Sequence, residues 1–278
     1  MEELGLITAL PIRRFTDFGA YLGLHSGEEV LLPQGYLTGN EVEGDMVEVF
    51  VYTDSEDRPV AVTQHPKVLL DEFAVLEVKE TTSFGAFLDW GLPKDLFVPN
   101  SEMGKPMEVG QKHLIRVCVD HKTTRLIGVS KYAGFIGPAP VEFMTGLPLT
   151  GLIFDLTDLG YKVLVESQFE GLLYANEVFE PIEIGEKRTV YLKKRRDDGK
   201  LDLQLLPTGR EKYEEGAQKI LDVLATESVL KLHDKSSPEE IKEKLGMSKK
   251  HFKQSIGQLY KARKIVLLPD GIALNSSN

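Results

Sequence analysis

The chain has 278 residues, of which 42% are hydrophobic and 8% aromatic, and a net charge of −10. This length and apolar content predict two to four packed domains and exclude a disordered chain. No apolar run approaches the ~20 residues of a membrane-spanning helix, and the acidic opening Met-Glu-Glu-Leu is unlike a secretory signal. We therefore expect a cytoplasmic protein with no membrane partner. The single cysteine, Cys118, excludes an intrachain disulfide, and its alternating surroundings predict a buried strand position.

The charge is unevenly distributed along the chain. Residues 1–66 carry a net charge of −9 and residues 67–140 are neutral, whereas residues 141–209 carry −4 and residues 210–278 carry +3. A polyanion is therefore repelled most by the first quarter of the chain and least by the last.

One pattern recurs three times and predicts three small domains, residues 1–66, 67–140 and 141–209. The first copy contains "FGAYLGL", "EEVLLPQGYL" and "DMVEVFVYT", and the second "FGAFLDWGL", "KDLFVPNSEM" and "HLIRVCVD". The worn third copy contains "DLGYKVLV", "EGLLYANEVF" and "RTVYLKK". Each copy predicts five short strands, and a closed barrel would leave them without open edges. The Gly of Phe-Gly-Ala interrupts a strand, which predicts a bend, a bulge or a close backbone approach.

The last segment, residues 210–278, changes to a helical pattern. Apolar spacing predicts helices at 213–225 and 249–263, the second with an apolar stripe of Phe252, Ile256, Leu259 and Tyr260. A helix between them is predicted by the capping box of Ser237 and Glu240, with Gly246 as its end.

The turn "PDG" then predicts a hairpin. Three helices and a hairpin predict a winged helix-turn-helix, whose third helix would be the recognition helix.

The repeat resembles the S1 RNA-binding domain, a five-stranded barrel of the oligonucleotide-binding (OB) fold. That family's signature runs roughly Phe-Gly-Ala-Phe-Val, Glu-Gly-Leu-Val-His-x-Ser, Gly-Asp-x-Val and Asp-x-x-x-Arg-hydrophobic-x-Leu-Ser, and all three copies follow it in order and spacing. Three S1 copies before a winged helix resemble the conserved virulence factor B family (CvfB or YitL-like) of Gram-positive bacteria. The resemblance implies a mainly β protein with a small α+β C-terminal domain, which regulates genes by binding RNA and is not an enzyme.

The resemblance also implies an RNA face made of second-strand aromatics, a third-strand His and an acidic–Arg pair near the last strands. In the first copy these positions give Phe18, Tyr21 and Arg58. In the second they give Phe84, Phe87, His121 and Arg125, and in the third Lys162, Tyr174, Arg196 and Lys200. The His position falls on Leu32, Val98 and Tyr174, so no copy keeps the His. The basic run "KKRR" adds Lys193, Lys194, Arg195 and Arg196.

Each of these candidates has a structural alternative. Aromatics three residues apart lie on opposite faces of a flat strand unless the Gly bends it, so they could serve packing alone. The "KKRR" run could be a solvated loop, and we expect Trp90 to pack. The predicted recognition helix offers phosphate contacts from Lys249, Lys250, Lys253, Arg263 and Lys264, or a solvated face on a domain that binds protein.

No motif predicts catalysis, a metal or a cofactor. The six histidines are scattered, and neither a phosphate-binding Gly loop nor a Gly-x-Ser-x-Gly elbow is present. We expect single-stranded RNA as the partner, no small-molecule substrate, and post-transcriptional regulation. One alternative is a protein-interaction module that docks on the ribosome or polymerase, with the acidic first domain on a basic surface. A second alternative is a duplex DNA-binding regulator that acts through the winged helix.

Overall fold

The structure is a computed structural model that describes residues 1–54, 56, 58–206 and 210–275, and side chains within 210–215 are left out. The chain forms two compact units, Met1–Ile136 and Gly137–Asn278, which are described separately. The prediction of a mainly β protein is confirmed. The predicted domain boundary at residue 209 lies outside the described residues.

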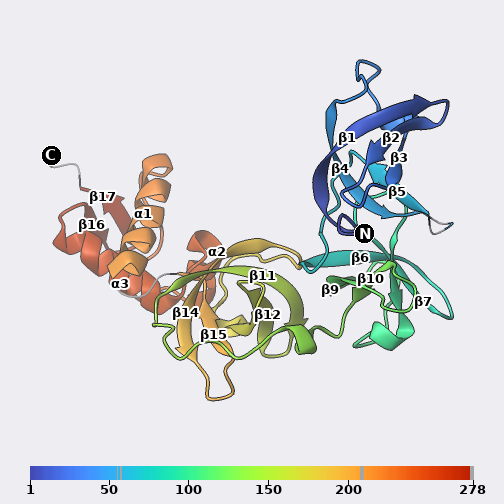
Figure 1. Cartoon of the computed structure of the whole chain (residues 1–278). Coiled ribbons are helices and arrows are strands. Elements are labelled where there is room, and N and C mark those ends of the chain that lie inside the picture. Colours follow the sequence, from blue (N-terminus) through green and yellow to red (C-terminus); the bar gives the residue numbers. More distant parts are fainter. Residues whose placement is uncertain (55, 57, 207–209, 276–278) are drawn as a thin grey trace. The chain divides into compact units, whose positions relative to one another are not determined.

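The first unit begins with the barrel drawn in blue in Figure 1. Its strands are β1 (Ile7–Thr16), β2 (Gly19–Gly23), β3 (Glu29–Pro33), β4 (Met46–Thr53) and β5 (Pro59–Val62). They close in the order β1-β2-β3-β5-β4, with β3 and β5 parallel.

The second barrel has the same strand order and belongs to the same unit. Its strands are β6 (Phe73–Thr81), β7 (Gly85–Asp89), β8 (Leu96–Pro99), β9 (Lys112–Val119) and β10 (Leu126–Val129). Within the described residues, β8 and β10 form no hydrogen-bonded ladder. Val98 instead packs over Gly128 so closely that a Cβ there would lie 2.7 Å away, so side-chain packing closes this barrel.

The second unit contains the third barrel and the winged helix. The barrel strands are β11 (Pro148–Thr157), β12 (Gly160–Val165), β13 (Phe169–Tyr174), β14 (Lys187–Arg195) and β15 (Leu201–Gln204), and they close in the same order. The winged helix consists of α1 (Arg210–Thr226), α2 (Pro238–Leu245), α3 (Lys249–Lys261), β16 (Ile265–Leu268) and β17 (Gly271–Leu274). The predicted three barrels and winged helix are confirmed.

The predicted helix caps are also confirmed. Ser237 and Glu240 form a reciprocal capping box at the start of α2, and Gly246 ends that helix in the left-handed conformation at φ 62°. Helix α3 has a cap as well, since Ser248 accepts a hydrogen bond from the main-chain nitrogen of His251.

The first barrel has a core of its own, and a second hydrophobic cluster extends from the core of the second barrel to side chains of the first. Trp90 of the second barrel is only 2% exposed and packs edge-on against Phe50 and Tyr52 of β4, with ring centroids 5.6 and 6.2 Å apart. The prediction that Trp90 packs is therefore confirmed, and a buried aromatic cluster joins the two barrels.

The Phe-Gly-Ala stretch forms a tight hairpin tip at the start of the second strand. The main-chain nitrogen of Phe84 donates to Thr82 Oγ1 at 3.3 Å, and Thr82 Oγ1 donates to the carbonyl of Gly85 at 3.1 Å. The first barrel repeats both bonds with Thr16, Phe18 and Gly19. The aromatic therefore lies in the turn before the strand, and not within the strand as the sequence suggested.

Glycine is required after this aromatic because two backbones approach each other there. A Cβ on Gly85 would lie 2.6 Å from a ring carbon of Phe97 and closer still to the carbonyl oxygen of Val98. Of the three readings left open by the sequence, close backbone approach is the correct one.

We predict that Gly85→Ala lowers the free energy of unfolding by about 2 kcal/mol, because the backbone of β8 has to move. Gly134→Ala is the matched control, since a Cβ there meets nothing within 4 Å, and its effect should stay within about 0.5 kcal/mol. Urea unfolding followed by the fluorescence of Trp90, the chain's single tryptophan, measures both. Equal stability of the two variants would contradict the prediction.

Candidate functional site

The outer face of the second barrel carries two aromatic rings on neighbouring strands. Ala86 and Leu88 are buried, so Phe87 between them points outward from β7. Phe87 lies opposite Phe97 of β8, with the ring centroids 5.1 Å apart and the planes at 40°. The two rings form a continuous aromatic surface.

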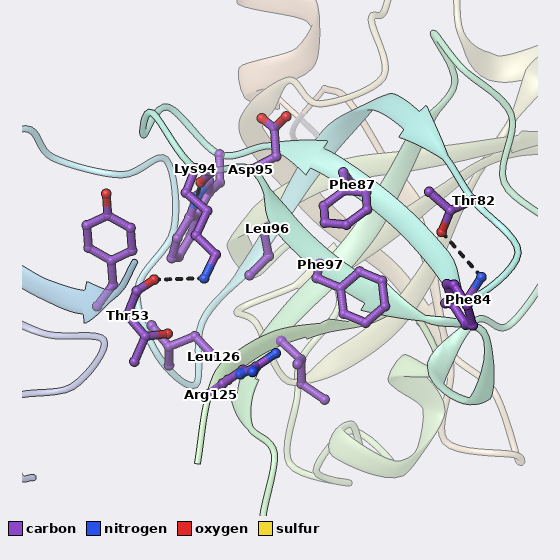
Figure 2. A pocket seen from close by; sticks show the side chains of 13 residues that line it. Thr53, Thr82, Phe84, Phe87, Lys94, Asp95, Leu96, Phe97, Arg125 and Leu126 are labelled. Atoms are coloured by element: carbon purple, nitrogen blue, oxygen red, sulfur yellow. Dashed lines mark hydrogen bonds between the residues drawn. The ribbon is translucent and has the colours of Figure 1, made fainter. Parts of the chain in front are cut away.

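This surface borders a pocket of about 410 Å³. Phe84 stands at the hairpin tip beside it and is 77% exposed, while Arg125 precedes β10. In the view of Figure 2, Phe87 and Phe97 lie between Asp95 and Arg125. A concave, largely apolar site with a few polar groups suits a flat aromatic ligand. The pocket is lined by Tyr52, Thr53, Thr82, Phe84, Phe87, Trp90, Lys94, Asp95, Leu96, Phe97, Arg125, Leu126 and Ile127.

The inner end of the pocket lies where the two barrels of the first unit meet. Lys94 Nζ donates to the carbonyl oxygens of Thr53 and Asp54 at 2.9 and 2.6 Å, and Figure 2 shows the first bond. Trp90 Nε1 donates to the carbonyl oxygen of Lys94 at 2.6 Å. Burial raises the pKa of Tyr52, which keeps its hydroxyl neutral at ordinary pH. The inner end thus combines the rings of Tyr52 and Trp90 with an ammonium group that main-chain carbonyls hold in place.

Asp95 gives one end of the pocket a carboxylate. Burial raises the pKa of Asp95, and the neighbouring charge of Asp89 raises it further. Asp89 is itself bound by Lys67 Nζ at 2.8 Å, and this hydrogen bond lowers its pKa. Phosphate groups are therefore disfavoured beside Asp95 and favoured beside Arg125.

The structure brings together three of the four residues predicted for the second barrel: Phe84, Phe87 and Arg125. His121 is exposed in the turn before Arg125 and does not line the pocket. Phe97 was missed, although its outward position follows from its place between the buried Leu96 and Val98 in "DLFVP".

The third-strand position at which the S1 family has a His was assigned to the wrong residue in the first and second copies. Tyr174 lies opposite the first Gly of β12, and the residues opposite the equivalent glycines are Pro33 and Pro99. Leu32 and Val98 lie one residue earlier and are fully buried, because a shift of one residue turns a side chain to the other face.

In the first barrel, one of the two predicted aromatics is already covered. Phe18 is 75% exposed at its hairpin tip. The guanidinium of Arg14 lies 3.9 Å from the ring centroid of Tyr21 and is held by Glu29 at 2.7 Å. Arg14 thus occupies the ring face on which a base would stack.

The predicted Arg58 is also engaged within the first barrel. Its guanidinium contacts Asp54 at 2.8 Å and Glu56 at 2.9 Å. The hydrogen bond to Asp54 raises the pKa of Arg58, which remains a cation. The carboxylates of Asp54 and Glu56 neutralise the positive charge of Arg58, so this residue adds little attraction for phosphate.

The third barrel has a pocket of about 330 Å³ at the corresponding position, but its lining differs in chemistry. Leu159, 67% exposed, replaces the hairpin aromatic, and Lys162 lies in the outward position of the second strand. Glu170 accepts a hydrogen bond from Lys200 at 2.8 Å and lies 4.0 Å from Lys162. This face is charged and has no ring for stacking among its described lining residues.

A polar network fixes Arg196 and Tyr174 of the third barrel. Arg196 Nε donates to Asp202 Oδ1 at 2.6 Å, and Arg196 Nη2 donates to the hydroxyl of Tyr174 at 3.2 Å. Burial by itself would lower the pKa of Arg196, but the hydrogen bonds and charge interactions with Asp202 and Tyr174 together outweigh it and raise the pKa. Both predicted residues therefore support the barrel.

The rest of the "KKRR" run is divided between different partners. Lys193 Nζ is bonded to Glu177, and Arg195 Nε donates to the carbonyl oxygen of Ala139 at 2.8 Å. Lys194 is exposed, and no ion pair to it is found among the described residues. The run is therefore not a uniform basic patch.

The winged helix presents most of its predicted cations to solvent. Lys249 is half-buried, with its ammonium 3.5 Å from the carbonyl oxygen of Lys235. The other predicted cations, Lys250, Lys253, Arg263 and Lys264, are exposed. Tyr260, expected in the apolar stripe, is 55% exposed and lies at the solvent edge of that stripe.

Other kinds of site receive no support within the described residues. The described residues contain no group of three or more His, Cys, Asp or Glu that could hold a metal ion. They also contain no helix long and apolar enough to cross a membrane. Cys118 is half-buried on β9 and not fully buried as expected; burial raises the pKa of its thiol.

Comparisons with known families match two regions of the chain. Residues 4–64 match the S1 domain, and residues 218–274 match the CvfB-like winged helix domain. The first region lies in the first barrel and the second in the C-terminal domain.

Whole-chain comparisons give the same picture. Uncharacterized protein YitL of Bacillus subtilis is 28% identical over 92% of this chain and 88% of its own. Conserved virulence factor B of Staphylococcus aureus strain USA300 is 29% identical over 90% of this chain and 86% of its own. A solved multidomain protein with nucleic acid binding domains from Streptococcus pneumoniae is 27% identical and covers 99% of both chains, with a TM-score of 0.47. The resemblance to conserved virulence factor B proteins, predicted from the sequence, is confirmed.

We predict that Arg196→Ala destabilises the second unit by about 1 kcal/mol, because it leaves Asp202 and Tyr174 without their shared donor at a partly exposed site. Lys194→Ala, two residues away, is the control and should stay within about 0.5 kcal/mol of the parent chain. Thermal unfolding monitored by circular dichroism compares them. A larger loss from Lys194→Ala would show that the network does not stabilise the barrel.

Proposed function

We propose that this protein binds single-stranded RNA through the aromatic face of its second barrel and thereby regulates gene expression after transcription. The observation that carries the proposal is the cluster of the exposed Phe84 and the half-buried Phe87 and Phe97, which line one pocket with Arg125. Monomeric proteins seldom leave several aromatic rings exposed together unless the surface binds something.

The chemistry of this face favours unpaired bases. Every nucleobase has a flat π-face, and each base stacked on an aromatic side chain contributes roughly 1–3 kcal/mol. Arg125 can add a phosphate contact or stack on a base itself. Bases in a duplex already stack on each other, so single-stranded RNA fits this surface better than a double helix.

The third barrel and the winged helix would add weaker contacts. Lys194 and the exposed cations of α3 suit phosphate oxygens, which they would hold without reading sequence. Several weak sites on one chain raise the effective concentration of each for the same RNA. The name of the Staphylococcus aureus relatives, conserved virulence factor B, supports a role in virulence.

Two other functions remain as alternatives. The first is docking on a ribosomal or polymerase protein, favoured by the net charge of −9 over residues 1–66. The second is duplex DNA binding through α3, whose exposed cations include Lys250 and Lys253. Affinities for single-stranded RNA and duplex DNA at one salt concentration separate the proposal from the second alternative. A pull-down that survives nuclease treatment would favour the first.

We predict that Phe84→Ala combined with Phe87→Ala weakens binding of a single-stranded RNA at least tenfold, because two stacking platforms are lost. The matched control is Phe18→Ala with Tyr21→Ala, which changes the corresponding pair of the first barrel. Fluorescence anisotropy measures affinity, and circular dichroism checks that the barrels remain folded. Unchanged affinity in the Phe84 and Phe87 variant would remove this face from the mechanism.

We also predict that Lys194→Gln makes the plot of log affinity against log salt shallower by about 0.7, the value for one phosphate contact on a single strand. Changing Lys193 to Arg196 together to Gln should flatten the plot by little more, since carboxylates or main-chain carbonyls hold the other three. A fourfold larger change would mean that the whole run contacts phosphate.

A further inference from the structure

The outer face of the first barrel is occupied by the barrel's own side chains. The ring face of Tyr21 is covered by Arg14, which Glu29 holds, and Arg58 is paired with Asp54. A base that stacked here would have to displace a charge-assisted ion pair. The net charge of −9 over residues 1–66 adds repulsion of phosphate. This barrel is poorly suited to bind RNA on its own face.

The same barrel nevertheless contributes to the pocket of its neighbour. Tyr52 and Thr53, at the end of β4, line the pocket that contains Phe84, Phe87 and Phe97. One wall of the pocket therefore comes from the first barrel, and its aromatic wall comes from the second. Thr53 and Lys94 lie next to each other at the inner end in Figure 2.

Two interactions fix the shared wall in place. The ammonium of Lys94 bonds to the main-chain carbonyls of Thr53 and Asp54, so it holds the end of β4 against the second barrel. Trp90 is buried between this lysine's carbonyl oxygen and the ring of Tyr52. Partly buried hydrogen bonds to the main chain hold a wall more rigidly than a surface ion pair does.

We propose that the first barrel completes the pocket of the second, so that a single unpaired nucleobase is held between walls from both barrels while the first barrel's own outer face binds no RNA. The inference rests on the proposed function and extends it to the role of the acidic barrel. Lys94 acts as a positioning residue: its ammonium is directed at main-chain carbonyls and not at RNA.

The occupant follows from the lining. The pocket of about 410 Å³ falls within the range of small-ligand sites and is walled by Phe87, Phe97, Tyr52 and the buried Trp90. Asp95 disfavours a phosphate inside, whereas Arg125 attracts one at the other end of the aromatic face. A flat, neutral base with its phosphate outside meets all of these conditions.

The test is the salt dependence of RNA affinity in Lys94→Met, measured on the full chain with a single-stranded RNA. Methionine keeps the aliphatic stem and removes the two hydrogen bonds to the carbonyls. We expect about fivefold or greater weakening with an unchanged salt slope, because no phosphate contact is lost. Arg125→Met is the comparison, and it should weaken binding and flatten the slope by about 0.7.

A second variant tests the wall without removing the lysine bonds. Thr53→Trp leaves the main-chain carbonyls in place and fills the pocket from the first barrel's side, so it should also weaken binding at least fivefold. Phe18→Ala with Tyr21→Ala should stay within about twofold of the parent chain. The fluorescence of Trp90 in Lys94→Met reports whether the shared core is intact.

The results separate the inference from the proposed function. Loss of binding in the Phe84 and Phe87 variant together with full binding by Lys94→Met and Thr53→Trp would overturn the inference alone. A flatter salt slope in Lys94→Met would also overturn it, because the ammonium would then contact phosphate. Weakening by the Phe18 and Tyr21 variant would give the first barrel a binding face of its own. Full binding by every variant would overturn the proposed function as well.

Discussion

The close approach of the second strand to the third determines what each barrel can present to a ligand. Because a Cβ on Gly85 would collide with the β8 backbone, only glycine allows β7 to start there. The hairpin tip is then fixed by Thr82, whose hydroxyl bonds on both sides of Phe84. A large apolar ring is thereby held in solvent by main-chain geometry, although burial would otherwise be favoured.

The three barrels use this geometry with different side chains. The hairpin residue is exposed in each barrel as Phe18, Phe84 or Leu159, but the strand residues around it differ. The outward residue of the second strand is Tyr21 in the first barrel, where an arginine covers it. In the second barrel it is Phe87, which pairs with another ring, and in the third barrel it is Lys162. One strand order therefore supports a closed face, an aromatic face and a charged face, because the outward residues differ from barrel to barrel.

The barrels and the winged helix could be predicted from the sequence, because alternation and capping are local properties. The capping box of Ser237 and Glu240 is an example, since both partners lie within one turn. Which cations form ion pairs within the barrels, and which remain available to a ligand, could not be predicted. Arg14 pairs with Glu29, 15 residues away, and Lys193 pairs with Glu177, 16 residues away. The pairing of the strands brings these residues together, and the sequence pattern does not specify it. Phe97 could have been predicted from alternation, but the family's His position directed attention to Val98.

A net charge of −10 limits how this protein could attract RNA. Long-range attraction needs a basic surface, and the described cations of the third barrel are largely neutralised by their neighbours. In the proposed function, affinity has to come from short-range stacking on the aromatic rings that line the pocket. Such a pocket needs rigid walls more than it needs charge. An acidic barrel that is joined to its neighbour by a buried aromatic cluster can supply a wall, and its own charge then keeps the phosphates on the side of Arg125.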